Sequence, residues 1–216
     1  MSGVPVPRLT PDAEVRALAA LELDSIARGV ECLDALLKEA PVVAHIAQGS
    51  SDGKYLIVAS GEVEEAAQAM GRAIEVGGDA IVDDVLLPAP HPQLVAALRA
   101  GSDPVERATP PAIAVIETRG APALLGSADT AVKTGETQIA AVHLLAGIGG
   151  KSTVVLTGDV ESVRVASEAG ADFARSRDLL VHEVVIPRPD PGVVPFLDPL
   201  FLEPDRLDRR PDLDRL

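Results

Sequence analysis

The segment Ala146-Gly147-Ile148-Gly149-Gly150-Lys151 joins two apolar runs, Ile139 to Leu145 before it and Ser152 to Thr157 after it. Glycine adopts positive φ angles and lets two backbones approach closely, so this cluster predicts a tight turn between two strands. The chain makes the same kind of turn once before, at Gly49 to Gly53, between apolar runs of similar length. This repetition predicts that the chain folds as two copies of one unit.

The two halves of the chain correspond position by position. Matching residues keep their order at separations of 95 to 99 residues, and two small insertions explain the drift. The matched pairs are Glu22 and Glu117, Asp34 and Asp129, Lys38 and Lys133, Gly53 and Gly150, Lys54 and Lys151, Gly61 and Gly158, Val63 and Val160, Pro88 and Pro187, Pro92 and Pro191, and Leu98 and Leu197. An internal duplication accounts for this many ordered matches.

Each half predicts four strands and two helices of an α/β fold, of the α+β, ferredoxin-like kind. In the first half we expect strands at 18–23, 42–47, 54–59 and 80–87, helices at 26–38 and 63–76, and a short helix after His91. In the second half we expect strands at 112–118, 139–145, 152–157 and 180–186 and helices at 122–133 and 160–175. The predicted units are an N-terminal arm (1–16), a first domain (17–99), a linker (100–111), a second domain (112–198) and a C-terminal tail (199–216).

Composition excludes several classes of protein. A formal charge of −14 argues against nucleic-acid binding, which needs clustered Lys and Arg. The single cysteine, Cys32, excludes an internal disulfide framework and fits a reducing cytoplasm. No apolar run reaches the roughly 20 residues that span a bilayer, and no secretory signal is recognisable at the N-terminus. Both the proline-containing arm and the charge-dense tail are predicted to be disordered, with a short docking peptide in the tail as the alternative.

The second half resembles the bacterial microcompartment shell domain. The resemblance lies in Ala112-Ile-Ala-Val-Ile-Glu-Thr-Arg-Gly120, Ala128-Asp129, Lys133, Gly147-Ile-Gly-Gly150, Leu156-Thr-Gly-Asp-Val160 and Val184-Val-Ile-Pro-Arg-Pro189. Two such domains in one chain are similar to the tandem shell proteins, which implies a homotrimer that mimics a hexamer. The resemblance implies a structural role without catalysis or cofactors, with hexameric and pentameric shell proteins as lateral partners.

The same resemblance implies a central pore for small metabolites. The family's pore position falls at Asp52 in the first half and at Gly149 in the second, so the expected pore lining is Ser51, Asp52, Gly53, Ile148, Gly149 and Gly150. A rim that alternates carboxylate and glycine would carry negative potential, and we expect it to admit neutral or cationic solutes more readily than anions. The alternative is an aspartate chosen for its turn propensity alone.

The resemblance also assigns three residues to the edges of the tile. Lys38 and Lys133 end the first helix of each half, and Arg188 lies in the proline-flanked stop after the last strand. The alternative for both lysines is a helix-terminal position that the helix dipole favours. Ala89 stands where Arg188 stands, and Leu23-Asp24-Ser25 replaces Thr118-Arg119-Gly120, so the two kinds of edge should differ.

The sequence gives little support to a metal site, a phosphate-binding loop or an enzyme active site. The four histidines, His45, His91, His143 and His182, have no metal-ligand spacing to one another or to Cys32, which is predicted to be a buried structural thiol. Lys151-Ser152 ends a glycine-rich segment, but Leu145 stands where a phosphate-binding loop needs glycine. No nucleophile, base and orienting group form a set, so an enzyme is disfavoured. The remaining alternative to a shell tile is a duplicated small-molecule-binding or regulatory α/β protein.

Overall fold

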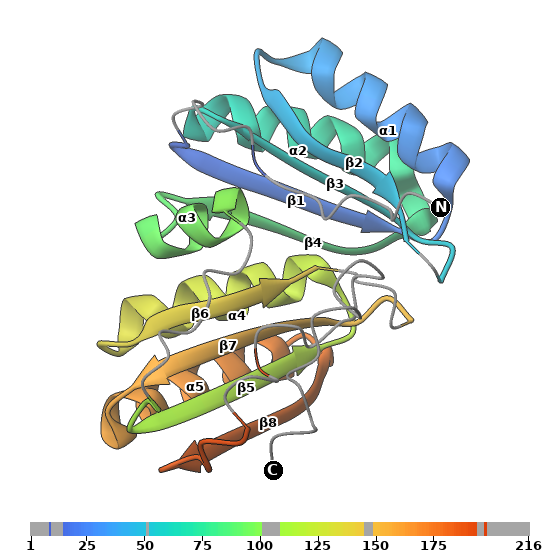
Figure 1. The fold of residues 1–216 in the computed structure, drawn as a ribbon. Coiled ribbons are helices and arrows are strands. Elements are labelled where there is room, and N and C mark those ends of the chain that lie inside the picture. Colours follow the sequence, from blue (N-terminus) through green and yellow to red (C-terminus); the bar gives the residue numbers. More distant parts are fainter. Residues whose placement is uncertain are drawn as a thin grey trace, which may run out of the picture.

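The computed structural model describes residue 9 and residues 15–50, 52–100, 109–144, 149–193 and 197. Each half of the chain forms one four-stranded antiparallel sheet with two long helices (Figure 1). Repeat 1 contains β1 (Ala17–Leu23), α1 (Ile26–Glu39), β2 (Val43–Gly49), β3 (Tyr55–Gly61), α2 (Val63–Gly77), η1 (Gly78–Ala80), β4 (Ile81–Pro88) and α3 (Pro92–Ala100). Repeat 2 contains β5 (Ala112–Thr118), α4 (Ala121–Thr134), β6 (Gln138–His143), β7 (Ser152–Gly158), α5 (Val160–Arg175) and β8 (Leu180–Pro187).

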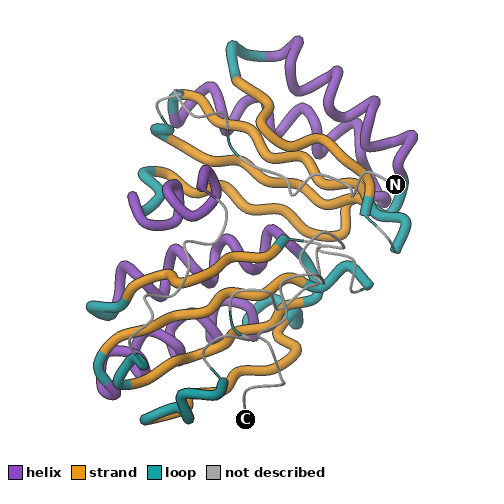
Figure 2. The backbone as a smooth tube through the Cα atoms, in the orientation of Figure 1, coloured by secondary structure: helices purple, strands orange, loops and turns teal. Residues whose placement is uncertain are grey.

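The two sheets have the same topology. The strand order is β2-β3-β1-β4 in repeat 1 and β6-β7-β5-β8 in repeat 2. Figure 2 shows the two sheets one after the other, with helices between them and on the outer side of repeat 1. The expected duplication and fold class are therefore confirmed.

Local sequence explains where the helices begin. Ser25 caps α1 by accepting a hydrogen bond from the backbone N–H of Arg28, and Asp159 caps α5 in the same way. Helix α4 differs, since it follows Gly120 and has Pro122 in its first turn but no side-chain cap from its own neighbours. Its cap comes from the other repeat, as described below.

The apolar stripe of α1 does not face its own sheet. Ile26, Val30 and Leu37 are exposed, whereas the residues of α1 that pack on repeat 1 are Gly29, Cys32 and Leu36. The matching stripe of α4, Ala121, Leu125, Ala128 and Val132, is buried. The two stripes differ because α4 lies against β4 and β1 of repeat 1, whereas no element of the other repeat covers α1 among the described residues (Figure 1).

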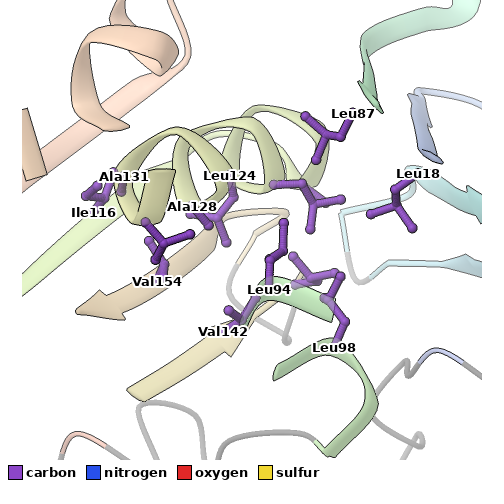
Figure 3. Packing of buried hydrophobic residues seen from close by; sticks show 14 of the residues in the cluster. Leu18, Leu87, Leu94, Leu98, Ile116, Leu124, Ala128, Ala131, Val142 and Val154 are labelled. Atoms are coloured by element: carbon purple, nitrogen blue, oxygen red, sulfur yellow. The ribbon is translucent and has the colours of Figure 1, made fainter. Parts of the chain in front are cut away.

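The contact between the repeats belongs to the larger of the two apolar clusters that the described residues form. We call this contact the seam, and it is formed by β1, β4 and α3 of repeat 1 with α4 and β6 of repeat 2. Figure 3 shows Leu94 and Leu98 of α3 close to Leu124 of α4 and Val142 of β6. Leu9 also belongs to this core and its backbone N–H bonds to the carbonyl of Leu98 at 2.9 Å.

Candidate functional site

The two glycine turns adjoin within a single chain. Gly53, Gly149 and Gly150 all have φ between 67° and 86°, a conformation that favours glycine. A β-carbon placed on Gly150 would overlap the Asp52 carboxylate and lie 3.1 Å from the Lys54 Nζ atom. Gly150 therefore serves both the turn and the close approach of the first turn. Ser51 and Ile148 lie outside the described residues.

Lys54 connects the first turn to Glu22 on β1 and to the backbone of Arg119 in repeat 2. Its Nζ atom lies 2.9 Å from Glu22 Oε1 and 3.3 Å from Asp52 Oδ2, and it donates a hydrogen bond to the Arg119 carbonyl at 3.1 Å. Burial alone would raise the pKa of Asp52, but the hydrogen bond from Ser50 Oγ and the charge of Lys54 lower it. Asp52 is thus ionised at neutral pH and paired. The sequence did not predict this pairing, because it does not reveal which residues the Lys54 side chain reaches.

Glu22 is a buried carboxylate that caps a helix of the other repeat. Its Oε2 atom accepts a hydrogen bond from the backbone N–H of Ala121 at 2.9 Å, which supplies the missing cap of α4. Gly120 leaves room for this contact, since a β-carbon there would lie 2.5 Å from Glu22 Oε2. Burial raises the pKa of Glu22, and Lys54 and the Ala121 N–H oppose that rise.

A second charged contact crosses the seam. Arg177 Nε and Nη2 lie 3.1 and 2.5 Å from Asp83 Oδ1, and Nη2 also donates to the Asp84 carbonyl at 2.7 Å. Asp83 is buried and lies directly opposite Glu22 on the neighbouring strand. Sequence reasoning missed this pair. The only available signal was the two-residue insertion in the turn after α5, where Arg177 lies and repeat 1 has no counterpart.

In repeat 2 the same acidic and basic pair is partly exposed, and no element of the described residues from repeat 1 covers it. Lys151 Nζ lies 2.9 Å from Glu117 Oε1, as Lys54 does from Glu22. The side chains of Glu117 and Lys151 are 27% and 43% exposed, against 0% and 20% for Glu22 and Lys54. On β8, His182 lies opposite Glu117 in the place of Asp83, and Val184 is exposed in the place of buried Val85. We call this surface of β5 and β8 the open face.

The predicted edge lysines have different surroundings. Lys133 lies 2.6 Å from Asp129 Oδ2, and Asp129 Oδ1 accepts a hydrogen bond from the His91 backbone N–H at 2.7 Å. Lys133 is thus beside the stop of repeat 1, which contains Ala89. Lys38 pairs with Asp34 at 2.7 Å and its side chain is 74% exposed. Lys38 has no contact with Arg188 among the interactions of the described part of the chain, so the edge roles stay predictions.

The described residues include no metal-binding cluster and no membrane-spanning helix. Within those ranges no cluster of three or more His, Cys, Asp or Glu side chains has a geometry that could hold a metal ion. Nor does any described helix have the length and apolar character to cross a membrane. Cys32 is buried and free, and lies against the end of α2 near Gly77.

Comparison with known proteins places this geometry in a family. The profile of the BMC domain matches residues 17–90 and 112–189. The chain is 36% identical over 174 residues to the bacterial microcompartment shell protein PduT of Citrobacter freundii, covering 81% of this chain and 93% of that protein. It is 38% identical over 78 residues to the shell protein EutM of Salmonella typhimurium, covering 36% of this chain and 79% of that protein.

A solved structure agrees with the sequence relatives. A microcompartment protein from Desulfitobacterium hafniense DCB superposes with a TM-score of 0.71 at 37% sequence identity, covering 83% of this chain and 98% of that one. The two profile matches together span more than half of the chain. This protein therefore belongs to the BMC domain family and carries two copies of the domain.

Proposed function

We propose that this protein is a structural tile of a bacterial microcompartment shell, built from three copies arranged as a pseudohexamer around a narrow pore. Relatives that bear the name of microcompartment shell protein support the shell role. The comparisons give no support to the alternative of a small-molecule-binding regulator.

The observation that carries the proposal is that the chain closes one seam and leaves residues of both halves of a second seam exposed. One half is the apolar stripe of α1, with Ile26, Val30 and Leu37 exposed. The other is the open face, where Glu117 and Lys151 repeat the geometry of Glu22 and Lys54. The stripe of α4 covers the corresponding face of repeat 1, so α1 of a second copy fits the open face of the first.

A contact of this kind joins two different surfaces and therefore propagates from copy to copy. Such head-to-tail contacts produce a ring when the rotation closes and a filament when it does not. Six domains of similar shape around one axis require three chains with two domains each. In this arrangement Glu117 would cap α1 of the next copy, as Glu22 caps α4 within the chain.

The adjoining glycine turns are then the pore rim. Because Gly150 and Asp52 already touch across the seam, repeating the seam six times brings six turns around the axis. Repeat 1 contributes Glu22, Asp52 and Lys54, whose charges leave one net negative charge, and repeat 2 contributes the balanced pair of Glu117 and Lys151. We propose a rim with weak negative potential that favours neutral and cationic metabolites.

The outer edge of the tile is proposed to carry Lys38, Lys133 and Arg188. In the ring, Lys133 lies beside Ala89 of its own chain, and Lys38 would lie beside Arg188 of the preceding copy. Three edges with an arginine and three without it would then alternate around the tile. Lateral partners are other shell proteins, which meet the tile at these edges.

Mass and lattice formation test the proposal together. Light scattering of the purified chain should report about three times its mass of 22.3 kDa, and electron microscopy of concentrated material should show sheets. A monomer at micromolar concentration with no ordered sheets would contradict both the ring and the tile.

A further inference from the structure

The residues that precede α1 and α4 have the same backbone conformation. Ser25 has φ and ψ of −139° and 120°, and Gly120, which matches it in the second repeat, has −156° and 160°. Each carbonyl accepts a hydrogen bond from the backbone N–H four residues later, at Gly29 and Leu124. Gly120 is buried in the seam, whereas Ser25 is partly exposed. The start of α1 therefore presents to solvent the backbone shape that α4 presents to repeat 1.

The seam leaves no room for a side chain at Gly120. A β-carbon there would lie 2.5 Å from Glu22 Oε2 and 3.9 Å from Asp83 Oδ2, so Gly120 faces two carboxylates. Ser25 has the β-carbon that this geometry excludes. A helix that begins after Ser25 therefore needs an acidic partner that can withdraw, and Glu117, whose side chain is 27% exposed, is less confined than Glu22.

The hydroxyl of Ser25 supplies a hydrogen-bond donor at this point. Its oxygen accepts a hydrogen bond from the Arg28 N–H at 3.3 Å, which caps α1 and leaves the hydroxyl hydrogen available for a carboxylate. The backbone N–H of Ile26 matches that of Ala121, which donates to Glu22. A carboxylate at the start of α1 would thus receive a hydrogen bond from the serine in addition to the one from the backbone.

His182 removes a charge that the contact between copies could not balance. It lies opposite Glu117 on β8, in the position that Asp83 has on β4. The buried Asp83 carboxylate is paired with Arg177 of repeat 2, and repeat 1 has no residue that matches Arg177. An aspartate at position 182 would therefore be buried without a cation, whereas a neutral imidazole carries no charge and both donates and accepts hydrogen bonds.

Lys151 adds a match of charge. In the seam, Lys54 donates to the carbonyl of an arginine, Arg119, at 3.1 Å. The residue that matches Arg119 is Asp24, which immediately precedes Ser25 and is exposed. Lys151 would thus lie beside an anion at the start of α1, where Lys54 lies beside a cation at the start of α4. The start of α1 and the open face are therefore complementary in charge as well as in backbone shape.

We propose that Ser25 of one copy docks between Glu117 and His182 of the next copy and donates its hydroxyl hydrogen to the Glu117 carboxylate. The proposal rests on the ring proposed above. The occupant is a second copy because α1 and β8 lie at opposite ends of the fold (Figure 1), so the two surfaces do not meet within one chain. The ring then alternates a seam that contains the ion pair of Asp83 and Arg177 with one in which both are replaced by uncharged groups.

Two substitutions of equal size at Ser25 test this contact. Aspartate and asparagine cap helices as serine does, so α1 keeps its cap in S25D and S25N. S25D places a carboxylate against Glu117 and should raise the half-trimer concentration, at which half of the protein is trimeric, at least about a hundredfold. S25N, whose amide can still donate, should stay within about tenfold of wild type. Mass photometry measures this concentration, and far-UV circular dichroism checks that each variant is folded.

A second pair of substitutions tests the other side of the contact. H182D adds an unpaired carboxylate and should raise the half-trimer concentration at least about tenfold. H182N stays uncharged and should change that concentration by less than about threefold. Equal half-trimer concentrations for H182D and H182N would overturn the placement of His182 in the contact.

A double substitution decides whether Ser25 faces Glu117. E117Q removes the charge that repels the new carboxylate, so S25D should cost less than about tenfold in the E117Q chain. The same hundredfold cost in both chains, or equal half-trimer concentrations for S25D and S25N, would overturn the docking. Failure of the ring is a different outcome, because the wild-type chain would then be monomeric.

Discussion

Glu22 and Glu117 occupy matching positions in the two repeats and bind their lysines at the same distance of 2.9 Å, yet one is fully buried and the other is 27% exposed. The difference lies in what covers them. Helix α4 covers Glu22 within the chain, and no element of the described residues covers Glu117. Because the exposed pair repeats the geometry of the buried pair, we expect a helix equivalent to α4 to cover it when copies assemble.

The seam within the chain and the proposed seam between copies nevertheless differ in their charged residues. The closed seam contains the ion pair of Asp83 and Arg177, whereas the open face has His182 in place of Asp83, and α1's repeat lacks the insertion that carries Arg177. The anion and the cation are thus both missing from the second seam. We expect the contact within the chain to be more strongly fixed than the contact between copies.

The largest expected effect is loss of assembly through the stripe of α1. V30D places a carboxylate on the surface that we propose to be buried against the open face, and burying an unpaired charge costs several kcal/mol. Sedimentation should then show a monomer that keeps its melting temperature. V165D is the matched control, because Val165 is an exposed valine on α5. Assembly of V30D at the wild-type level would contradict the proposed interface.

The next effect is on the closed seam. R177A leaves the buried Asp83 carboxylate without its partner and should lower the free energy of unfolding by about 2 to 4 kcal/mol. H182A changes the position of the open face that corresponds to Asp83, and should alter the free energy of unfolding by less than about 0.5 kcal/mol. Urea unfolding of the two variants measures the difference. Equal effects would mean that the ion pair does not distinguish the seams.

A matched pair of glutamate substitutions separates folding from association. E22A removes the cap of α4 and should lower the melting temperature of the chain. E117A should leave that temperature unchanged and raise the half-trimer concentration about tenfold, because a hydrogen bond to a charged group contributes about 1.5 to 3 kcal/mol. If E117A lowers the melting temperature and spares the trimer, Glu117 has only an internal role.

The smallest expected effect concerns Asp52 and pH. Its folded-state pKa is lowered below the ordinary value of 3.8, so its contribution to stability is present above that pH and is lost as the pH falls through the folded pKa. Wild type should therefore lose slightly more stability than D52N between pH 5 and pH 3, by under about 1 kcal/mol. Urea titrations at both pH values check this. A larger acid loss in D52N would reverse the assigned sign.

Periodicity and the internal repeat predicted the elements well because both are local properties of the chain. The helix from Ile26 and the strand at 112–118 agree with the structure to within one or two residues. The direction of the α1 stripe was not predictable, since an apolar face looks the same whether it packs on its own sheet or on a second copy.

The sequence also did not predict which residues far apart in the chain form ion pairs. Lys54 and Lys151 were matched as equivalent residues, but their partners Glu22 and Glu117 come from other strands, and no spacing rule links them. Arg177 and Asp83 are 94 residues apart, and the insertion that carries Arg177 has no counterpart for comparison. The assignments of Asp52 and Gly149 to a pore rim and of Lys38, Lys133 and Arg188 to the edges stay predictions.

A structure of the assembled particle by electron cryomicroscopy tests the central claim most directly. We expect three chains around a threefold axis, with Asp52 and Gly149 alternating at the central opening and α1 of each copy against β5 and β8 of its neighbour. A particle with another symmetry, or one that puts both of these positions at its periphery, would contradict the account.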